Sequence, residues 1–409
     1  MEKNVFKMPD KQANETERDY HIRTSRNRLV DTNSWREVHF KKSRNRINKC
    51  MSLKEAVQEF VIDGDIISDT GFSWVRGCTQ AFFEMIRQEK RELTLMGAPI
   101  GVGGIPIGGG IIGYMHNSYT GAEMRGIDKM FHRSIKEKKV EPLSEWSHGA
   151  QALGFKAAQM GVPYLASKVM LGSDMVKHNP YVKISSHAFK DEPEKDMVCL
   201  IPALYPDIVF IHVQKADKYG NAMIWGPVVN DIALSVASRK VVITCEELVS
   251  EDEIRNNTSG NSIPFMYVDA VVEMPFGNVP GSVPGYYYWH RQWWEQGVRI
   301  AFQSDENFNK FLDYWVFSCR DHYDFVDKLG GGIREIVKRN KLTKVAEGLN
   351  DIGVIDYDYK EVNSEQYPYW RYPWEESYEQ EINRQTETLL RLKNLEEFEQ
   401  SQNNKGGII

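Results

Sequence analysis

The sequence contains no long apolar run. No stretch approaches the ~18 uninterrupted apolar residues of a membrane-spanning helix, so none is expected. The N-terminus is polar and lacks the apolar segment of a secretory signal. The five cysteines are scattered and form no CxxC or His-spaced pair. We therefore expect neither a disulfide framework nor a metal site, and a reducing cytoplasm is the natural compartment.

The sequence also lacks an excess of positive charge. Its net charge of −6 argues against non-specific nucleic-acid binding as a main role. Charge is nevertheless uneven: residues 1–50 hold 13 Lys/Arg against 7 Asp/Glu, and residues 351–409 hold 6 against 13. Two interpretations stay open: the flanks pair with each other or with a partner protein, or both are solvated extensions.

Short apolar segments alternate with helical patterns from residue 51 onward. Ser52, followed three residues later by Glu55, is a capping box that starts a helix. We expect strands at 66–69, 93–96, 111–117, 164–167 and 268–274, and helices at 79–89, 127–139 and 145–160. This alternation predicts an open, doubly wound, mostly parallel α/β sheet in one domain, residues 51–340. A basic N-terminal extension (1–50) and an acidic, aromatic-rich C-terminal extension ending in a helix (341–409) flank it.

Residues 207–247 carry the most specific signal. Two β-branched runs, 208–213 and 241–244, bracket a turn at Gly220 and a helical segment, as in a parallel sheet buried on both faces. The following residues stand in an order found in one enzyme family: His212, Gly220, Ile224, Trp225, Gly226, Asp231, Thr244, Cys245, Glu246 and Glu247. The segment resembles the α (A) subunit of family I coenzyme A transferases, of the glutaconate CoA-transferase type.

The resemblance is collinear over about residues 51–335, and it implies both a fold and a chemistry. The implied fold is the open α/β architecture of that family. The implied substrates are CoA thioesters, with no tightly bound cofactor. The family uses covalent catalysis by a glutamate, which in this branch belongs to the β subunit. The resemblance therefore implies a chain that forms half a site with a β-type subunit, in an α2β2 or larger hetero-oligomer.

Two segments are candidates for substrate or CoA binding because they follow strands. The glycine-rich stretch 97–110 has no GK[ST] and is not a P-loop. We expect it to be a loop in which Gly101, Gly103 and Gly104 let backbone amides approach an acyl chain or phosphate. Gly71, Phe72 and Ser73 end the first strand, where such sheets bind ligands. Arg76 keeps the basic residue that the family has there, without its proline.

Further candidates come from later segments. Ser118 and Tyr119 offer hydroxyl donors for a carboxylate or thioester oxygen, and Glu123 is a candidate base or a solvated carboxylate. By resemblance, Gly172 and Ser173 lie near the acyl pocket. Glu145 and His148 are weak catalytic candidates, because ring-opening hydrolases on this fold carry an essential α-subunit glutamate near this place. Otherwise Ser144 is a helix cap and Glu145 a first-turn acid.

Other conspicuous residues are assigned structural roles. Cys245 sits in a buried strand and is expected to be inert packing. Glu246 and Glu247 are interpreted as structural or interface residues. The aromatic group at 286–289 with Trp293 and Trp294 is expected to pack in the core or an interface, or to narrow a substrate channel.

Three functions remain open from the sequence. The first is the α subunit of a CoA transferase that moves CoA between carboxylic acids. The second is the α subunit of a CoA-thioester or carbon–carbon-bond hydrolase, which needs a general base in this chain. The third is a non-catalytic binding relative. The acyl group is not readable from these residues.

Overall fold

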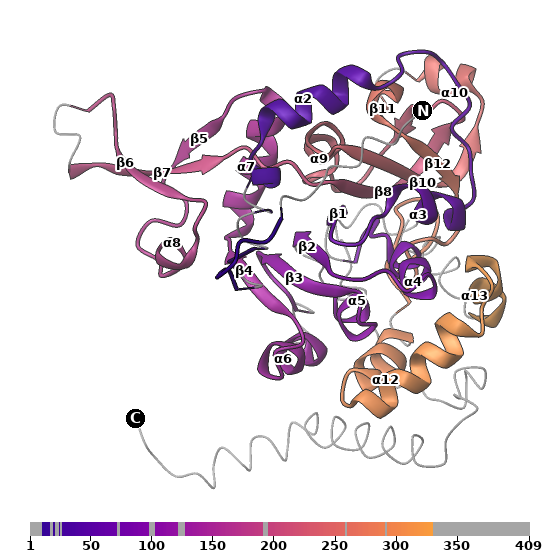
Figure 1. Ribbon diagram of the computed structural model, residues 1–409. Coiled ribbons are helices and arrows are strands. Elements are labelled where there is room, and N and C mark those ends of the chain that lie inside the picture. Colours follow the sequence, from indigo (N-terminus) through magenta and orange to yellow (C-terminus); the bar gives the residue numbers. More distant parts are fainter. Residues whose placement is uncertain are drawn as a thin grey trace, which may run out of the picture.

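The fold is built on a sheet of parallel strands (Figure 1). The computed structural model describes residues 10–16, 19, 20, 24, 27–71, 74–97, 103–121, 127–190, 195–257, 260–290 and 293–329. Within these ranges the parallel strands run in the order β4-β3-β2-β1-β8-β10-β12. They are β1 (Ile66–Asp69), β2 (Leu93–Gly97), β3 (Ile112–Asn117), β4 (Glu141–Glu145), β8 (Ile208–Asp217), β10 (Lys240–Val249) and β12 (Ala270–Glu273). Short antiparallel strands, β9 (Ala222–Met223) and β11 (Asn261–Ile263), extend the far end of β8. The predicted sheet is confirmed.

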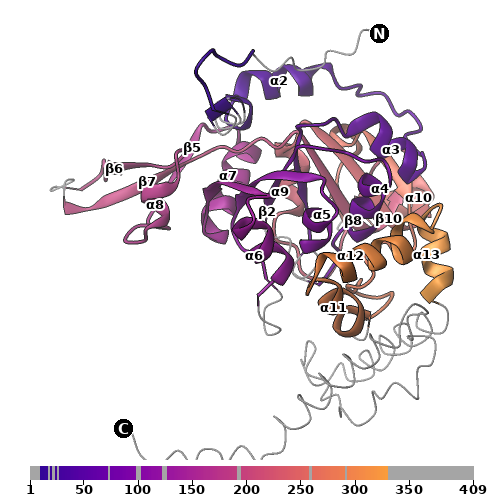
Figure 2. The ribbon, with the colours of Figure 1, turned by 60° about the horizontal axis from the view of Figure 1, so that its bottom comes forward.

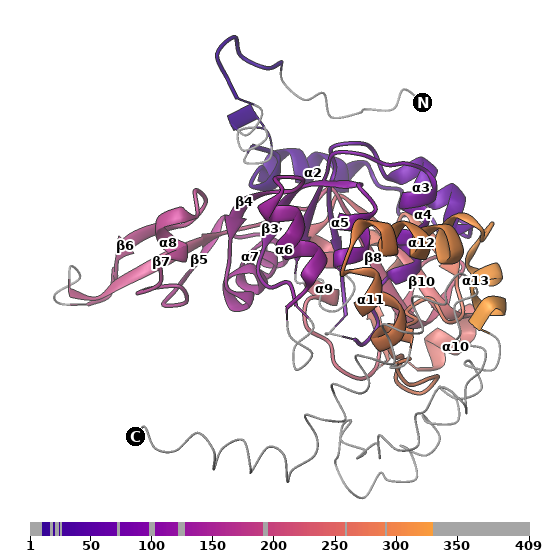
Figure 3. The same ribbon diagram turned by 90° about the horizontal axis from the view of Figure 1, so that it is seen from below.

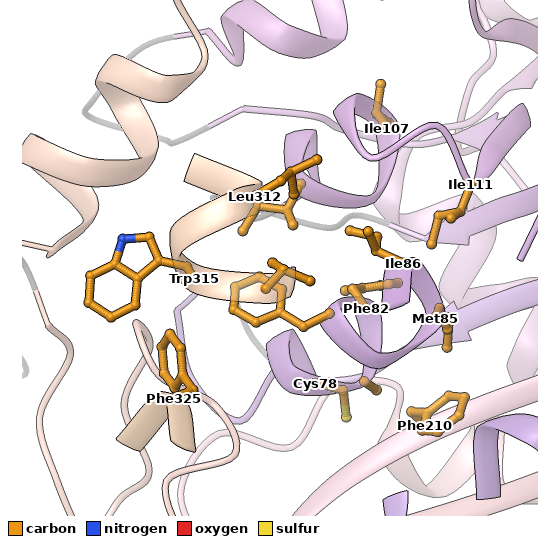
Figure 4. Close-up of a cluster of buried hydrophobic side chains, with 14 of the residues drawn as sticks. Cys78, Phe82, Met85, Ile86, Ile107, Ile111, Phe210, Leu312, Trp315 and Phe325 are labelled. Carbon is orange, nitrogen blue, oxygen red and sulfur yellow. The ribbon is translucent and has the colours of Figure 1, made fainter. Parts of the chain in front are cut away.

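Both faces of the sheet are apolar because successive strand residues point to opposite sides. Ile67 and Phe210 belong to one buried cluster, whereas Ile66 and Val209 belong to another. Figure 4 shows Phe210 near Met85 in the cluster of the first face. Helices on that side are α3 (Leu53–Phe60), α4 (Thr79–Arg87), α5 (Gly104–Gly108) and α6 (Lys129–Lys136); the other side carries α7 (His148–Met160) and α9 (Asp231–Ala237). Strands buried on both faces explain the continuous β-branched runs of the sequence.

Local signals set several element boundaries. The Ser52 hydroxyl accepts from the Glu55 amide at 3.2 Å and the Glu55 carboxylate accepts from the Ser52 amide at 2.9 Å, so the capping box is confirmed. The helix expected at 145–160 begins later, at His148, with Ser147 as its cap. Residues 141–145 form β4 instead. This edge strand was not predicted because its Pro and Glu residues are uncommon in strands.

Three strands lie outside the main sheet. The strand expected at 164–167 is β5 (Tyr164–Ser167), but it pairs antiparallel with β7 (Met197–Pro202), which also pairs with β6 (Lys183–Ser186). This small sheet and α8 (Met175–His178) project away from the body (Figures 1 and 3). Placing β5 in the main sheet was therefore wrong, because strand patterning does not tell which sheet a strand joins.

Part of the described N-terminal segment packs on the body, so the solvated-extension alternative is wrong for that part. It carries α2 (Thr32–Lys41), where the Trp35 indole donates to the carbonyl of Val236 at 3.0 Å. Lys42 pairs with Asp269 at 2.7 Å. This segment lies across the upper side of the molecule in Figure 2. The C-terminal extension predicted at 341–409 lies outside the described residues, so its pairing with the N-terminal segment stays a prediction.

A layer of short helices completes the first face. Trp293 packs edge-on to Trp315 with ring centroids 5.5 Å apart, and Phe325 lies against both rings. Tyr287, Trp293 and Trp294 are buried in the core, so the predicted packing role is confirmed for these three residues. The remaining elements are α10 (Glu251–Asn256), η3 (Phe265–Tyr267), η4 (Trp293–Val298), α11 (Arg299–Ala301), α12 (Asp305–Leu312), η5 (Asp313–Phe317) and α13 (His322–Leu329). Across the described residues no helix is long and apolar enough to cross a membrane.

Candidate active site

The carboxyl ends of four adjacent strands lie at one level. β1 pairs with β2 through Ile67 and Leu95, so Asp69 and Gly97, the last residues of the two strands, lie level. Asn117 then stands beside Gly97, and Glu145 beside Asn117. The segments that follow these strands meet at one edge of the sheet, where open α/β folds bind ligands.

Ser118, Tyr119 and His148 come together at this edge. The Ser118 amide and hydroxyl both donate to the carbonyl of Gly97, at 3.3 and 3.2 Å. The rings of Tyr119 and His148 have centroids 5.7 Å apart, although they belong to different strand–helix junctions. A Cβ on Gly121 would lie 2.8 Å from the Tyr119 hydroxyl, so a glycine at this position allows the hydroxyl to approach the backbone closely. The side chains of Tyr119 and His148 are both exposed at the surface.

Glu145 ends β4 with an exposed side chain, and its carbonyl accepts from the Asn179 amide group at 2.7 Å. Ser144 is not the helix cap. Its buried hydroxyl lies 2.8 Å from His116 Nδ1 and accepts from the Trp146 indole at 2.7 Å. Burial lowers the pKa of His116 to about 3, so this imidazole is neutral.

Arg76 does not face the open edge. Its guanidinium is fully buried and donates to Asp231 at 2.7 Å, to the carbonyl of His212 at 3.3 Å and to that of Pro227. A buried ion pair with further hydrogen bonds fixes the chain around it. The geometry supports an anchoring role in place of the predicted substrate contact. Gly71 has φ +107°, and a Cβ there would lie 2.3 Å from the carbonyl oxygen of Val75, so this tight turn requires glycine.

The glycine-rich stretch is not wholly a loop. Gly104 starts helix α5 and is buried, with an ideal Cβ 2.6 Å from the Phe302 ring and 2.7 Å from Asp128. Burial raises the pKa of Asp128, whose carboxylate accepts from the Phe131 amide at 2.9 Å. Gly103 is buried beside Gly104. The expectation of a loop is wrong for 104–108, where packing overrides the low helix propensity of Gly and Pro.

The other predicted residues either have local roles or lie outside the described part of the chain. Ser173 uses its hydroxyl within its own turn, donating to the carbonyl of Met170 at 2.7 Å, and Gly172 has φ +79° in that turn. Phe72, Ser73, Gly101 and Glu123 lie outside the described residues. Cys245 is buried, and burial raises the pKa of its thiol, in line with inert packing. The described residues contain no group of three or more His, Cys, Asp or Glu side chains that could hold a metal ion.

Sequence reasoning did not foresee the partner of Glu246. Glu246, predicted to be structural, is buried and accepts from the Tyr287 hydroxyl at 2.7 Å. This contact joins residues 41 apart in sequence, and no local spacing reveals it. Asn117, by contrast, opens the polar turn expected after the third strand, since polar residues at strand ends commonly shape sites. It accepts from the Thr120 hydroxyl at 2.7 Å, which shapes the turn beneath Tyr119.

A family model described as coenzyme A transferase matches residues 50–274, more than half of the chain. The chain belongs to the coenzyme A transferase family. The residues that end β1 to β4, and the buried Arg76 and Glu246, all fall within the matched region.

Individual relatives agree with this coenzyme A transferase assignment. The A-type subunit of glutaconate CoA-transferase from Acidaminococcus fermentans is 31% identical over 298 residues, 69% of this chain and 92% of the relative. The crystal structure of glutaconate coenzyme A-transferase from that organism matches with a TM-score of 0.66 and 29% identity, covering 70% and 94% of the two chains. An uncharacterized protein of Archaeoglobus fulgidus is 34% identical over 289 residues, 70% of this chain but only 63% of that relative, so the match spans less than two thirds of its length.

A more distant relative has a different activity in its name. The IpdA subunit of a cholesterol ring-cleaving hydrolase from Rhodococcus jostii is 24% identical over 188 residues, 44% of this chain and 62% of the relative.

Proposed function

We propose that this chain is the α-type subunit of a hetero-oligomeric CoA transferase, which moves CoA from an acyl-CoA donor to a carboxylic acid. The observation that carries the proposal is the match to the A-type glutaconate CoA-transferase polypeptide over 92% of its length. At this edge the exposed Tyr119 hydroxyl and His148 imidazole are suited to a carboxylate or thioester oxygen. The Ser118 amide and hydroxyl hold the turn by donating to the carbonyl of Gly97.

The reaction divides between two chains. The β-type subunit contributes a glutamate carboxylate that attacks the donor thioester, the carbon–sulfur bond breaks, and a mixed anhydride and CoA thiolate form. The thiolate then attacks the glutamyl carbonyl, which releases the donor acid and leaves a glutamyl–CoA thioester. The acceptor carboxylate reverses these steps. In this scheme the present chain binds and orients the acyl group and needs no nucleophile of its own.

The test is reconstitution with the β-type subunit. Co-expressed chains should co-elute in gel filtration and exchange CoA between an acyl-CoA and free acids. Borohydride or hydroxylamine should trap a glutamyl thioester on the β-type subunit, detected by mass spectrometry. An isolated chain that turns over acyl-CoA at the rate of the complex would contradict the proposal.

A second candidate is the α-type subunit of a CoA-thioester or ring-opening hydrolase. It is favoured by the partial match to the ring-cleaving hydrolase and by the exposure of Glu145 and His148 at the sheet edge. Release of free acid in water without transfer, together with no trapped thioester, would select it.

A further inference from the structure

Glu246 is a buried carboxylate surrounded by donors. It is 5% exposed, and its Oε1 accepts from the Tyr287 hydroxyl at 2.7 Å while its Oε2 accepts from the Phe276 amide at 2.8 Å. His212 Nε2 lies 2.7 Å from Oε1, and His212 Nδ1 lies 2.8 Å from the Thr244 hydroxyl. An imidazole that donates from Nε2 and accepts at Nδ1 satisfies both contacts. Burying a carboxylate is costly unless such bonds compensate, so these groups act as one unit.

Hydrogen bonds continue from this unit to the segment after β1. The Tyr287 hydroxyl accepts from the Asn278 amide at 3.1 Å. The Asn278 side chain donates to the carbonyls of Trp74, at 3.0 Å, and Ser282, at 2.8 Å. The Ser282 carbonyl also accepts from the Arg76 amide at 3.0 Å, and the Ser282 amide donates to the Trp74 carbonyl at 2.6 Å. The carboxylate on β10 is thereby linked to the backbone of residues 74–76.

The backbones in this region approach too closely for side chains. A Cβ on Gly281 would lie 2.2 Å from the Trp74 carbonyl, and one on Gly77 would lie 3.0 Å from Asn278. Gly71 rests against the carbonyls of Val75 and Arg76. The turn at Gly71 therefore depends on where residues 74–76 are held. Buried Arg76 fixes that segment to Asp231 on one side, and the chain of bonds from Glu246 holds it on the other.

We infer that Glu246 is a positioning residue: through Tyr287 and Asn278 it holds residues 74–76, against which Gly71 packs, in place after β1 at the substrate-binding edge. This inference rests on the proposed CoA-transferase function. Loss of the carboxylate loosens residues 74–76 and weakens binding of the acyl-CoA, whereas the chemical step, which uses the glutamate of the β-type subunit, proceeds once substrate is bound.

The test uses three variants, each in complex with the β-type subunit. Glu246→Gln replaces an acceptor-only group with an amide whose NH2 faces one of the donors, and Tyr287→Phe removes only the linking hydroxyl. Glu253→Gln is the control, because Glu253 forms an exposed pair with Lys215. Glu246→Gln and Tyr287→Phe should each raise KM for acyl-CoA about tenfold with kcat per folded complex nearly unchanged. The double variant should resemble either single one, since both interrupt the same connection.

Amide hydrogen exchange supplies a readout that does not need activity. Peptides covering residues 74–77 should exchange faster in Glu246→Gln and Tyr287→Phe than in wild type or Glu253→Gln. A purely structural role predicts lower Tm and less folded protein with unchanged KM, and that result overturns the inference, as does wild-type exchange at 74–77. If the wild-type complex does not transfer CoA, the proposed function is refuted. The hydrogen-exchange rates at residues 74–77 then still decide whether Glu246 positions this segment.

Discussion

Asp65, just before β1, has an unusual environment for a carboxyl group. Its burial, with Asp207 nearby, raises the pKa of this group to about 7. Lys240 lies 4.0 Å away and Arg28 is near, and both oppose the shift. The unfolded-state pKa is about 3.9. Because the folded value is higher, the protonated group stabilises the fold fully below about pH 4, and this contribution is lost as pH rises towards 7.

Asp65→Asn should therefore stabilise the protein more as pH increases. The neutral amide keeps an oxygen to accept the Ile62 amide hydrogen bond now made by Asp65 at 3.0 Å, and it cannot ionise. Thermal unfolding at pH 5, 6, 7 and 8 should show the Tm difference between variant and wild type growing with pH. A difference that stays constant across this range would show that Asp65 does not titrate there.

Glu145 and His148 distinguish the two reaction classes. In the transferase they shape the pocket, so Glu145→Gln and His148→Ala should each reduce kcat/KM of the complex by at most about tenfold, ~1.4 kcal/mol. In the hydrolase one of them is a general base, and its loss should reduce the rate by about 10²–10⁴-fold. A severe effect combined with no trapped thioester would replace the first proposal with the second.

At the scale of elements, α5 shows packing deciding the structure of a glycine-rich segment. Gly104→Ala should destabilise the fold by about 1–3 kcal/mol, because its Cβ would press on the buried Phe302 and Asp128. Gly149→Ala is the matched control: this glycine lies in α7 with its nearest neighbour, Val169, 3.7 Å away. The control should keep or raise Tm, since alanine favours helix over glycine. Equal effects in chemical denaturation would contradict the packing explanation.

The elements also show what the sequence reveals and what it does not. β1, β8 and β10 could be predicted because apolar β-branched runs bounded by turns are typical of buried parallel strands. The capping box at Ser52 was equally readable. β4 could not be predicted, because a polar edge strand has little hydrophobic periodicity. The partner of β5 could not be predicted either, because strand pairing joins residues far apart in sequence. At the site, Ser118 and Tyr119 follow from strand ends, whereas the burial of Arg76 depends on Asp231, 155 residues away.

At the scale of the whole molecule, the N-terminal segment closes the amino edge of the sheet. Arg28 pairs with Asp207 at 2.7 Å and donates to the carbonyl of Gly64 at 2.8 Å, and both side chains of the pair are less than a tenth exposed. Arg28→Ala should lower the free energy of unfolding by about 3 kcal/mol, because it leaves a buried carboxylate with less compensation. The control is Arg320→Ala, whose pair with Asp324 is largely exposed on the arginine side. It should leave Tm unchanged, and an equally small effect of Arg28→Ala would show that the edge is not closed by this pair.

The Arg28 contact shows that the boundary of the folded core differs from the boundary of the family match. The family match begins at residue 50, so an alignment would cut the chain there. Such a cut removes the guanidinium that faces Asp207 and the indole that covers Tyr205, yet it spares every strand of the sheet. A polypeptide cut at residue 50 should therefore be less stable than the full sequence, although it keeps the whole sheet. Residues ahead of the family match thus belong to the folded core.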